Sequence, residues 1–337
     1  MERIWNTLIV LVLSACSFSI PAFAQVPGSC WHYGTGFGSP NQAGTFDCQP
    51  SSSFEWTCKV WNTSCPPAGA ENETNPQGTC PTCNGGKPIN FETGNTFIEE
   101  NDIRIPGLAG GLTLTRTWNS KPSQHAPITG IFGPNWRSTY EERIFPETDG
   151  YVRYARADGS VWSFFGLNFL LLAGPSNVPA TLGGGDVDEP WSVTYHNGEQ
   201  RLFNAYSGSL TSIMDRNGNV TQLSYDGINR LVTVADPGGR HLYFSYASSS
   251  SYLVTAVTSD VGISLTYSYD SQGRLIQVTK PDLTTLSYAY DSNSNIITVT
   301  DSVGKILESH TYDSEGRGLT SSRANGVEAI SVTYSGQ

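Results

Sequence analysis

The sequence predicts an all-β fold built from antiparallel β-hairpins, and three observations support this prediction. The chain of 337 residues is rich in glycine (35) and tyrosine (16) and poor in methionine (2), a composition that suits strands and tight turns better than helices. Segments such as Leu112–Trp118 alternate apolar and polar residues, as half-buried strands do. In the C-terminal third, tyrosines and turn signals recur at regular intervals.

The first 24 residues are predicted to be an export signal. Arg3 precedes an apolar stretch, residues 7–15, which is shorter than the ~20 residues that a membrane-spanning helix needs. We expect cleavage after Ala24, which ends the small-residue motif Ala-Phe-Ala. As an alternative, Leu-Ser-Ala-Cys resembles a bacterial lipobox and would place a lipid anchor on Cys16. Either route predicts a protein in the periplasm, at the outer-membrane surface or outside the cell, and no later segment is predicted to span a membrane.

Residues 25–84 form a cysteine-rich segment. Its disulfide candidates are Cys30, Cys48, Cys58, Cys65, Cys80 and Cys83. An even, clustered set in an exported chain indicates a disulfide framework, for which six cysteines allow 15 connectivities. Cys80-Pro-Thr-Cys83 has the spacing of a redox motif, but the following Asn-Gly-Gly breaks the helix that such a motif needs, so a structural disulfide is favoured.

Residues 85–205 are predicted to be a β-rich domain. Tyr151–Tyr154 and Val161–Phe164 flank a turn and predict one hairpin. Trp191–Tyr195 and Gln200–Asn204 flank a turn containing Asn-Gly and predict a second one. We expect four tryptophans to anchor the core: Trp118, Trp136, Trp162 and Trp191.

Residues 206–337 are periodic. The recurring tyrosines, spaced 19 to 23 residues apart, are Tyr206, Tyr225, Tyr246, Tyr269, Tyr290, Tyr312 and Tyr334. Aspartate follows four of them, as Tyr225-Asp226, Tyr269-Asp270, Tyr290-Asp291 and Tyr312-Asp313. A Gly-Arg pair completes two of these units, as Gly273-Arg274 and Gly316-Arg317. Each unit contains two alternating segments and two turns, which predicts one hairpin. Because a lone hairpin is marginally stable in water, neighbouring hairpins are expected to pair edge to edge.

The repeated residue types have structural explanations. Aspartate can accept backbone N–H groups in an Asx-turn, the arginine can bond turn carbonyls or that carboxylate, and tyrosine supplies apolar area with a polar tip. We favour this structural interpretation. The functional alternative is a row of tyrosines that binds carbohydrate.

The period, the Tyr-Asp pair, the Gly-Arg-Leu sequence and the mid-repeat turn together resemble the YD or Rhs repeat family over residues 206–334. Gly85–Asn90 and Gly133–Arg137 are similar to the β-rich domain that precedes such repeats. The resemblance implies a curved sheet, part of a hollow β-shell of the kind that encloses a toxic C-terminal domain in proteins for bacterial competition or surface contact. Because the motif that ends such a shell is absent, we expect an open sheet edge that pairs with a protein partner or a C-terminal continuation.

No catalytic, cofactor-binding or metal-binding residue is predicted. A net charge of -11 without a basic run argues against nucleic acid. No histidine has metal-ligand spacing, and His196, His241 and His310 are expected at the surface. The acidic segment Gly183–Glu189 lacks the spacing of a calcium loop and is expected to be solvated. We therefore expect a scaffold without enzymatic activity. One alternative is a cell-surface adhesin or carbohydrate-binding module that uses exposed tyrosines and tryptophans, and another is an extracellular hydrolase.

Overall fold

The computed structural model describes residues 88–125, 129–147, 150–165, 174, 178–185 and 188–334, and the backbone of four strands at 30–37, 45–50, 55–62 and 84–85. The predicted export signal with Cys16 lies outside the described residues, as do Cys65, Cys80, Cys83 and Asp186 of the acidic segment. The side chains of Cys30, Cys48 and Cys58 also lie outside them. The export signal, the lipid anchor and the disulfides therefore stay predictions.

The predicted all-β fold is confirmed, because the described ranges contain strands and two 3-10 turns but no α-helix. Fifteen strands form one antiparallel sheet in sequence order. They are β14 (Ala180–Gly183), β15 (Trp191–Tyr195), β16 (Gln200–Phe203), β17 (Leu210–Met214), β18 (Val220–Tyr225), β19 (Leu231–Ala235), β20 (His241–Tyr246), β21 (Val254–Ser259), β22 (Ser264–Tyr269), β23 (Leu275–Thr279), β24 (Thr285–Tyr290), β25 (Ile296–Asp301), β26 (Ile306–Tyr312), β27 (Gly318–Arg323) and β28 (Ile330–Ser331).

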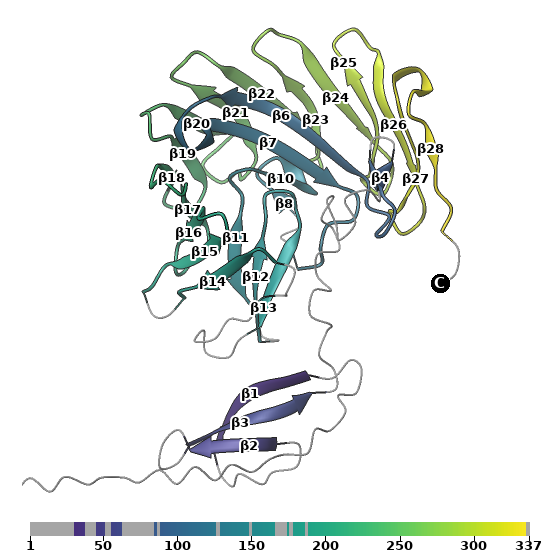
Figure 1. Ribbon diagram of the computed structural model, residues 1–337. Helices are drawn as coiled ribbons and strands as arrows, with labels where there is room; N and C mark the ends of the chain where they lie inside the picture. Colours follow the sequence, from purple (N-terminus) through teal and green to yellow (C-terminus); the bar gives the residue numbers. More distant parts are fainter. Residues whose placement is uncertain are drawn as a thin grey trace, which may run out of the picture.

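The large sheet is curved, and its hairpins follow one another along the curve (Figure 1). Alternation decides which side chains face inward: in β22, Leu265 and Tyr267 are buried while Ser264 and Thr266 are exposed. Each tyrosine unit contributes one hairpin, as predicted. The sheet already begins at β14, upstream of residue 206, the predicted start of the repeats.

The smaller sheets come from the preceding part of the chain. Their strands are β6 (Phe97–Ile105), β7 (Leu112–Asn119) and β10 (Trp136–Ser138) in one sheet, β11 (Arg143–Pro146), β12 (Tyr151–Ala155) and β13 (Val161–Phe165) in a second, and the pairs β4 (Asn84–Gly85) with β5 (Ile89–Asn90) and β8 (Thr129–Gly130) with β9 (Gly133–Pro134). The 3-10 turns are Leu108–Gly110 and Ala324–Gly326. A separate sheet has the order β1 (Cys30–Phe37), β3 (Glu55–Asn62), β2 (Thr45–Pro50).

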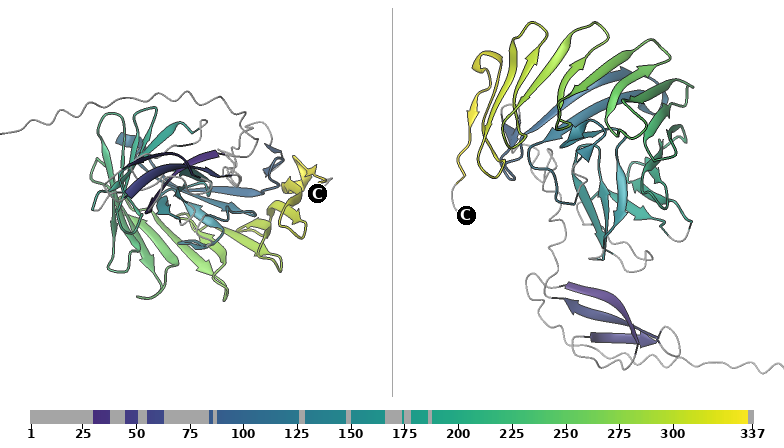
Figure 2. Two further views of the ribbon diagram at one scale, coloured as in Figure 1. Left: turned by 90° about the horizontal axis from the view of Figure 1, so that it is seen from below. Right: turned by 180° about the vertical axis from the view of Figure 1, so that it is seen from behind.

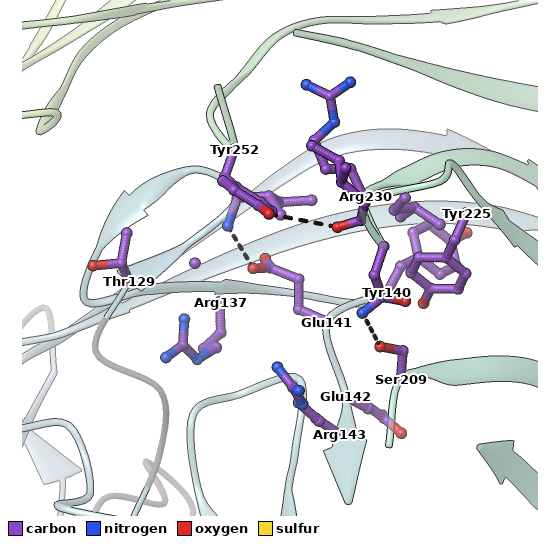
Figure 3. A pocket seen from close by; sticks show the side chains of 15 residues that line it. Thr129, Arg137, Tyr140, Glu141, Glu142, Arg143, Ser209, Tyr225, Arg230 and Tyr252 are labelled. Atoms are coloured by element: carbon purple, nitrogen blue, oxygen red, sulfur yellow. Dashed lines mark hydrogen bonds between the residues drawn. The ribbon is translucent and has the colours of Figure 1, made fainter. Parts of the chain in front are cut away.

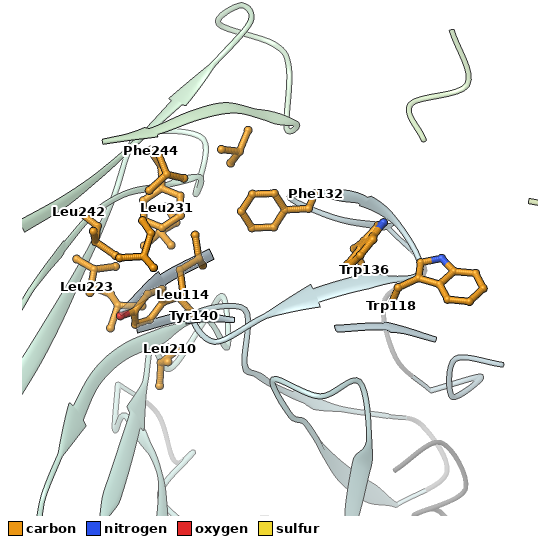
Figure 4. Packing of buried hydrophobic residues seen from close by; sticks show 14 of the residues in the cluster. Leu114, Trp118, Phe132, Trp136, Tyr140, Leu210, Leu223, Leu231, Leu242 and Phe244 are labelled. Atoms are coloured by element: carbon orange, nitrogen blue, oxygen red, sulfur yellow. The ribbon is translucent and has the colours of Figure 1, made fainter. Parts of the chain in front are cut away.

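The hairpin of β6 and β7 crosses the concave side of the large sheet (Figures 1 and 2). A large hydrophobic core results, in which Leu114 of β7 lies near Leu223 and Leu242 of the repeats (Figure 4). The four predicted tryptophan anchors are all buried, with Trp118 and Trp136 fully so. The prediction that His310 lies at the surface is wrong, because its side chain faces the concave side of β26 and the residue is only 3% exposed.

No helix among the described residues is long and apolar enough to cross a membrane.

Candidate functional site: the repeat seam and the filled concave face

The repeated tyrosines bind each hairpin unit to the unit before it. Each hydroxyl donates a hydrogen bond of 2.7–2.8 Å to a backbone carbonyl 15 or 16 residues upstream. The pairs are Tyr225 to Leu210, Tyr246 to Leu231, Tyr269 to Val254, Tyr290 to Leu275, Tyr312 to Ile296 and Tyr334 to Gly318. Tyr206 lies in the turn after β16 and is 81% exposed, so this series begins at Tyr225.

The aspartate after the tyrosine organises the turn. Oδ1 of Asp270 accepts hydrogen bonds of 2.9 Å from the backbone N–H groups of Gln272 and Arg274, and Oδ2 accepts one of 2.7 Å from Nε of Arg274. Burial raises the pKa of the Asp270 carboxyl, but these hydrogen bonds outweigh it and hold the pKa below its usual value. The same contacts recur at Asp226 with Arg230 and at Asp313 with Arg317.

The arginine held by this aspartate covers the tyrosine of the next unit. Arg230, Arg274 and Arg317 place their guanidinium carbons 4.4–4.9 Å from the ring centroids of Tyr246, Tyr290 and Tyr334. Burial raises the pKa of Tyr290 to about 12. We call this line of Tyr, Asp and Arg contacts the repeat seam. At Asp291 the partner is instead Asn295, whose Nδ2 donates to Oδ2 at 3.1 Å.

One described unit lacks the aspartate-centred turn altogether, and the preceding domain docks there. After Tyr246 a serine-rich loop, residues 247–252, replaces the Asp-to-Arg turn and delays the next strand partner to Val254. The N–H of Val254 donates to the carbonyl of Ile131 at 2.8 Å, and Phe132 packs against the Tyr267 ring with centroids 4.8 Å apart. The irregular unit thus accepts a loop of the preceding domain.

A buried ion pair joins the β6–β7 hairpin to the repeats. Arg116 binds Asp102 through two hydrogen bonds of 2.5 and 2.9 Å, and both side chains are at most 1% exposed. The Tyr267 hydroxyl donates to Asp102 at 2.8 Å. The guanidinium lies 4.6 Å from the Trp136 ring. Burial alone would lower the pKa of Arg116, but the Asp102 charge raises it well above its usual value.

Two further acids and a histidine face the same interior. Glu308 and His310 occupy the inward positions of β26, where β24 has Leu286 and Tyr288. Nε2 of His310 lies 3.4 Å from Oε2 of Glu308. On β6, burial raises the pKa of Glu100; Arg116 lowers it and Glu308 raises it further. These residues were missed in the sequence because alternation shows which positions face inward but not what covers them.

A cavity of about 510 Å³ lies where the preceding domain meets the repeats (Figure 3). Glu141 lines one side, and its Oε1 accepts a hydrogen bond of 2.6 Å from the Ile131 N–H, while burial raises its pKa. Burial lowers the pKa of the neighbouring Arg137, which is 5% exposed. Asn229 and Tyr252 of the repeats also line the cavity, and Figure 3 shows Tyr252.

The cavity lining brings together acidic and basic side chains, among them Glu141, Arg143 and Arg230. Among the residues that the structure describes, no group of three His, Cys, Asp or Glu side chains is arranged to hold a metal ion. The contacts within the repeat seam are those of a structural joint.

Comparisons with known proteins match two parts of the chain. Residues 86–164 match the family described as a domain of unknown function (DUF6531), and residues 191–336 match the Teneurin YD-shell family. The tRNA nuclease WapA of Bacillus subtilis (strain 168) is 28% identical over 143 residues, and the tRNA3(Ser)-specific nuclease WapA of Bacillus spizizenii is 30% identical over 144. Each match covers 42% of this chain and 6% of the relative.

Solved structures with similar segments include the crystal structure of TcdB2-TccC3-Cdc42. It is 16% identical with a TM-score of 0.28, and the match covers 69% of this chain and 12% of the other. The Photorhabdus luminescens Tc holotoxin pore is 13% identical with a TM-score of 0.25, and the match covers 71% and 14% of the two chains.

Proposed function

Because the chain is a YD/Rhs-repeat protein, we propose that it forms the closed end of a β-shell, with repeats as the wall and the preceding domain filling the concave side. The repeat seam carries the proposal. In each regular unit, the aspartate holds the arginine, the arginine covers the next tyrosine, and that tyrosine bonds back to the earlier unit. Such a seam stiffens a long curved sheet, and the polar groups of its tyrosines, aspartates and arginines are engaged in these contacts.

The filled interior distinguishes a closed end from an open stretch of wall. A one-sided sheet with inward Leu223, Val234 and Leu242 would expose apolar area on its concave side. The β6–β7 hairpin covers these residues, and the Arg116–Asp102 pair with Tyr267 fixes its position. Because the β6–β7 hairpin covers the concave side of these strands, we do not place enclosed cargo there. Any enclosed segment would lie beyond β28.

The seam contacts continue to the last described residue. Tyr334 follows β28, yet its hydroxyl already bonds to the Gly318 carbonyl and its ring already lies against Arg317. β28 itself has two residues and forms one edge of the sheet. An unpaired edge favours addition of a further strand. We therefore assign to this edge a C-terminal continuation or a partner protein.

The proposal includes export and a role in toxin delivery or cell-surface contact. The relatives named as tRNA nucleases support the association with toxins. Since the chain spans 6% of their length, their nuclease activity is not assigned to the residues discussed above. We assign the chain itself a structural role without catalysis.

The seam engages most of the tyrosines on which the glycan-binding alternative depends. The predicted row of tyrosines is engaged in the seam, where the hydroxyls bond to backbone carbonyls and arginines cover three of the rings. The four tryptophans expected to anchor the core are buried as well.

Protease protection of the protein recovered from its natural host tests the proposal. We expect the region 88–334 to resist digestion, and a polypeptide attached or bound at the β28 edge to be protected until denaturant opens the sheet. Digestion of that polypeptide at the rate of its free form would contradict the shell. Turnover of any substrate by the purified chain would contradict the non-catalytic role.

Intact mass of the same protein tests export. A mass that begins at Gln25 indicates cleavage after Ala24, and a diacylglycerol-modified Cys16 indicates the lipoprotein route. Reduction should add about six hydrogens if the six cysteines of the segment form three disulfides. An unprocessed N-terminus would contradict export by either route.

A further inference from the structure

One backbone position recurs along the repeat seam. It begins the strand that follows a seam tyrosine, lies opposite that tyrosine in the register, and offers its carbonyl to the hydroxyl of the next seam tyrosine. Because the N–H and C=O of one residue point to the same side of an antiparallel strand, the N–H also points toward the next unit. We call these positions the strand-start residues: Leu231, Val254, Leu275, Ile296 and Gly318.

Two of these N–H groups bind carbonyls of the preceding domain. The N–H of Val254 donates to the carbonyl of Ile131, and the N–H of Gly318 donates to the carbonyl of Gly94, each at 2.8 Å. Both carbonyls belong to turns with a left-handed glycine, since Gly94 has a φ of +74° and Gly133, two residues after Ile131, has a φ of +99°. A β-carbon added at either glycine would lie within 2.8 Å of an atom of the repeats. Glycine therefore allows each turn to approach the seam closely.

Leu231 holds the same position as Val254 and Gly318 but borders the cavity of about 510 Å³. Its N–H points toward the next unit, whose Tyr252 also lines the cavity (Figure 3). Two lining side chains of the repeats open to solvent, because Tyr252 is 55% exposed and Ile228 is 44% exposed. The cavity is thus accessible from outside and lies at a position where a peptide carbonyl is bound in two other units.

The charged side chains of the cavity lining favour an uncharged polar ligand over an ion. Arg230 binds the aspartate of its own turn, and Glu142 binds an arginine of β16. Arg137 and Glu141 attract each other electrostatically. Arg143 is the fifth charged residue of the lining, and it is exposed. Four of the five charges therefore have a counter-charge already, and the group best suited to such a site is a neutral one that forms hydrogen bonds.

We propose that this cavity binds a glycine-containing turn of a partner polypeptide, one of whose backbone carbonyls accepts the N–H of Leu231. The contact repeats the one that Ile131 makes with Val254. In that turn the next residue, Phe132, packs against a repeat tyrosine with ring centroids 4.8 Å apart. In the cavity, the exposed side chains of Ile228 and Tyr252 would receive the apolar residue that follows the carbonyl, and this contact removes apolar area from water. The site is independent of the β28 edge.

NMR titration of the purified full chain with a synthetic peptide tests the proposal. The probe is an end-blocked peptide with the sequence of residues 129–135, because the Ile131 carbonyl of this segment binds the equivalent N–H of Val254. We expect saturable shifts of the Leu231 amide and of residues 228–230. The dissociation constant should be on the order of 1 mM, because a short flexible peptide must be ordered on binding. Gly133→Ala in the peptide should weaken binding about tenfold, since alanine disfavours a φ near +99°.

Variants of the full chain locate the binding site. Tyr252→Ala and Ile228→Ser should each raise the dissociation constant of the peptide by about fivefold, because an apolar contact is lost. Both side chains are exposed, so thermal melts should stay close to those of the unchanged protein. Tyr243→Ala is the matched control, because Tyr243 is a 41% exposed tyrosine outside the cavity lining. It should leave peptide binding unchanged.

Hydrogen exchange in the free chain distinguishes a partner from the chain itself. We expect the Leu231 amide to exchange faster than the Val254 amide, and the peptide to slow it. Equal protection of the two amides without peptide would mean that the chain already fills the position, which overturns the proposal. A Leu231 amide that does not shift up to the solubility limit of the peptide overturns it as well. So do shifts centred on Val254, which would show displacement of the Ile131 turn, or binding that Tyr252→Ala does not weaken.

Discussion

Replacing Arg116 by methionine tests how the preceding domain is held against the repeats. Arg116 is fully buried, and its guanidinium neutralises Asp102, whose side chain is 1% exposed. Methionine has a similar length and suits the surrounding rings of Phe132 and Trp136. The substitution therefore removes the charge with little loss of packing. The Tyr267 hydroxyl then still donates a hydrogen bond to Asp102, but no positive charge balances the carboxylate.

The expected loss of stability is about 3–5 kcal/mol, the cost of leaving one member of a buried ion pair uncompensated. For a folded region of this size, that loss lowers the melting temperature by roughly 6–20 °C. The double variant Arg116→Met with Asp102→Leu removes both charges. We expect it to recover most of the loss, because apolar replacement of an entire buried pair is often nearly neutral.

Urea unfolding followed by tryptophan fluorescence measures these changes. Trp136 lies 4.6 Å from the Arg116 guanidinium and reports on this interior directly. Arg104→Met on the neighbouring strand β6 is the matched control, because Arg104 is exposed. The reasoning is refuted if Arg116→Met costs no more than Arg104→Met. It is also refuted if the double variant is no more stable than Arg116→Met alone.

Three further predictions concern the seam and the interior acids. Tyr290→Phe should cost about 1–2 kcal/mol by leaving the Leu275 carbonyl without its donor, whereas Tyr243→Phe, at a 41% exposed position, should cost almost nothing; equal costs in urea titrations would contradict the seam. Burial raises the pKa of Glu100, so the contribution of this carboxyl to stability is present below its unfolded-state pKa and is lost as the pH rises through its folded-state pKa. Glu100→Gln should therefore raise the melting temperature at pH 7, and this gain should disappear near pH 4. Glu99→Gln is the control, because Glu99 is exposed. Hydrogen bonds hold the pKa of the Asp270 carboxyl below its usual value despite burial, so its contribution to stability is present above its unfolded-state pKa and is lost as the pH falls through its folded-state pKa. Asp270→Asn should therefore destabilise the protein at pH 7 but not near pH 2. A loss of stability that is the same at both pH values would contradict the role of the ionised carboxylate.

Much of the repeat architecture follows from short-range patterns in the sequence. Alternation over six residues determines which side of a strand is apolar, and turn residues determine where the strand ends. The Asp270–Arg274 contact also lies within one turn, so residue spacing was enough to suggest it. The hydrogen bond from each tyrosine hydroxyl to an earlier carbonyl could not be predicted from such short-range patterns. A tyrosine hydroxyl reaches a carbonyl 15 residues upstream only after two strands have paired in register.

The tertiary structure decided what covers the concave face. Alternation places Glu308 and His310 on the inward side of β26, but a short hairpin array with an open interior would leave that side in water. The β6–β7 hairpin, about 200 residues earlier in the chain, crosses this concave side, on which His310 is only 3% exposed. Asp102 reaches Tyr267 across 165 residues for the same reason. Local sequence therefore determined the hairpins and their turns. The burial of charges depended on contacts between distant segments, which no local pattern specifies.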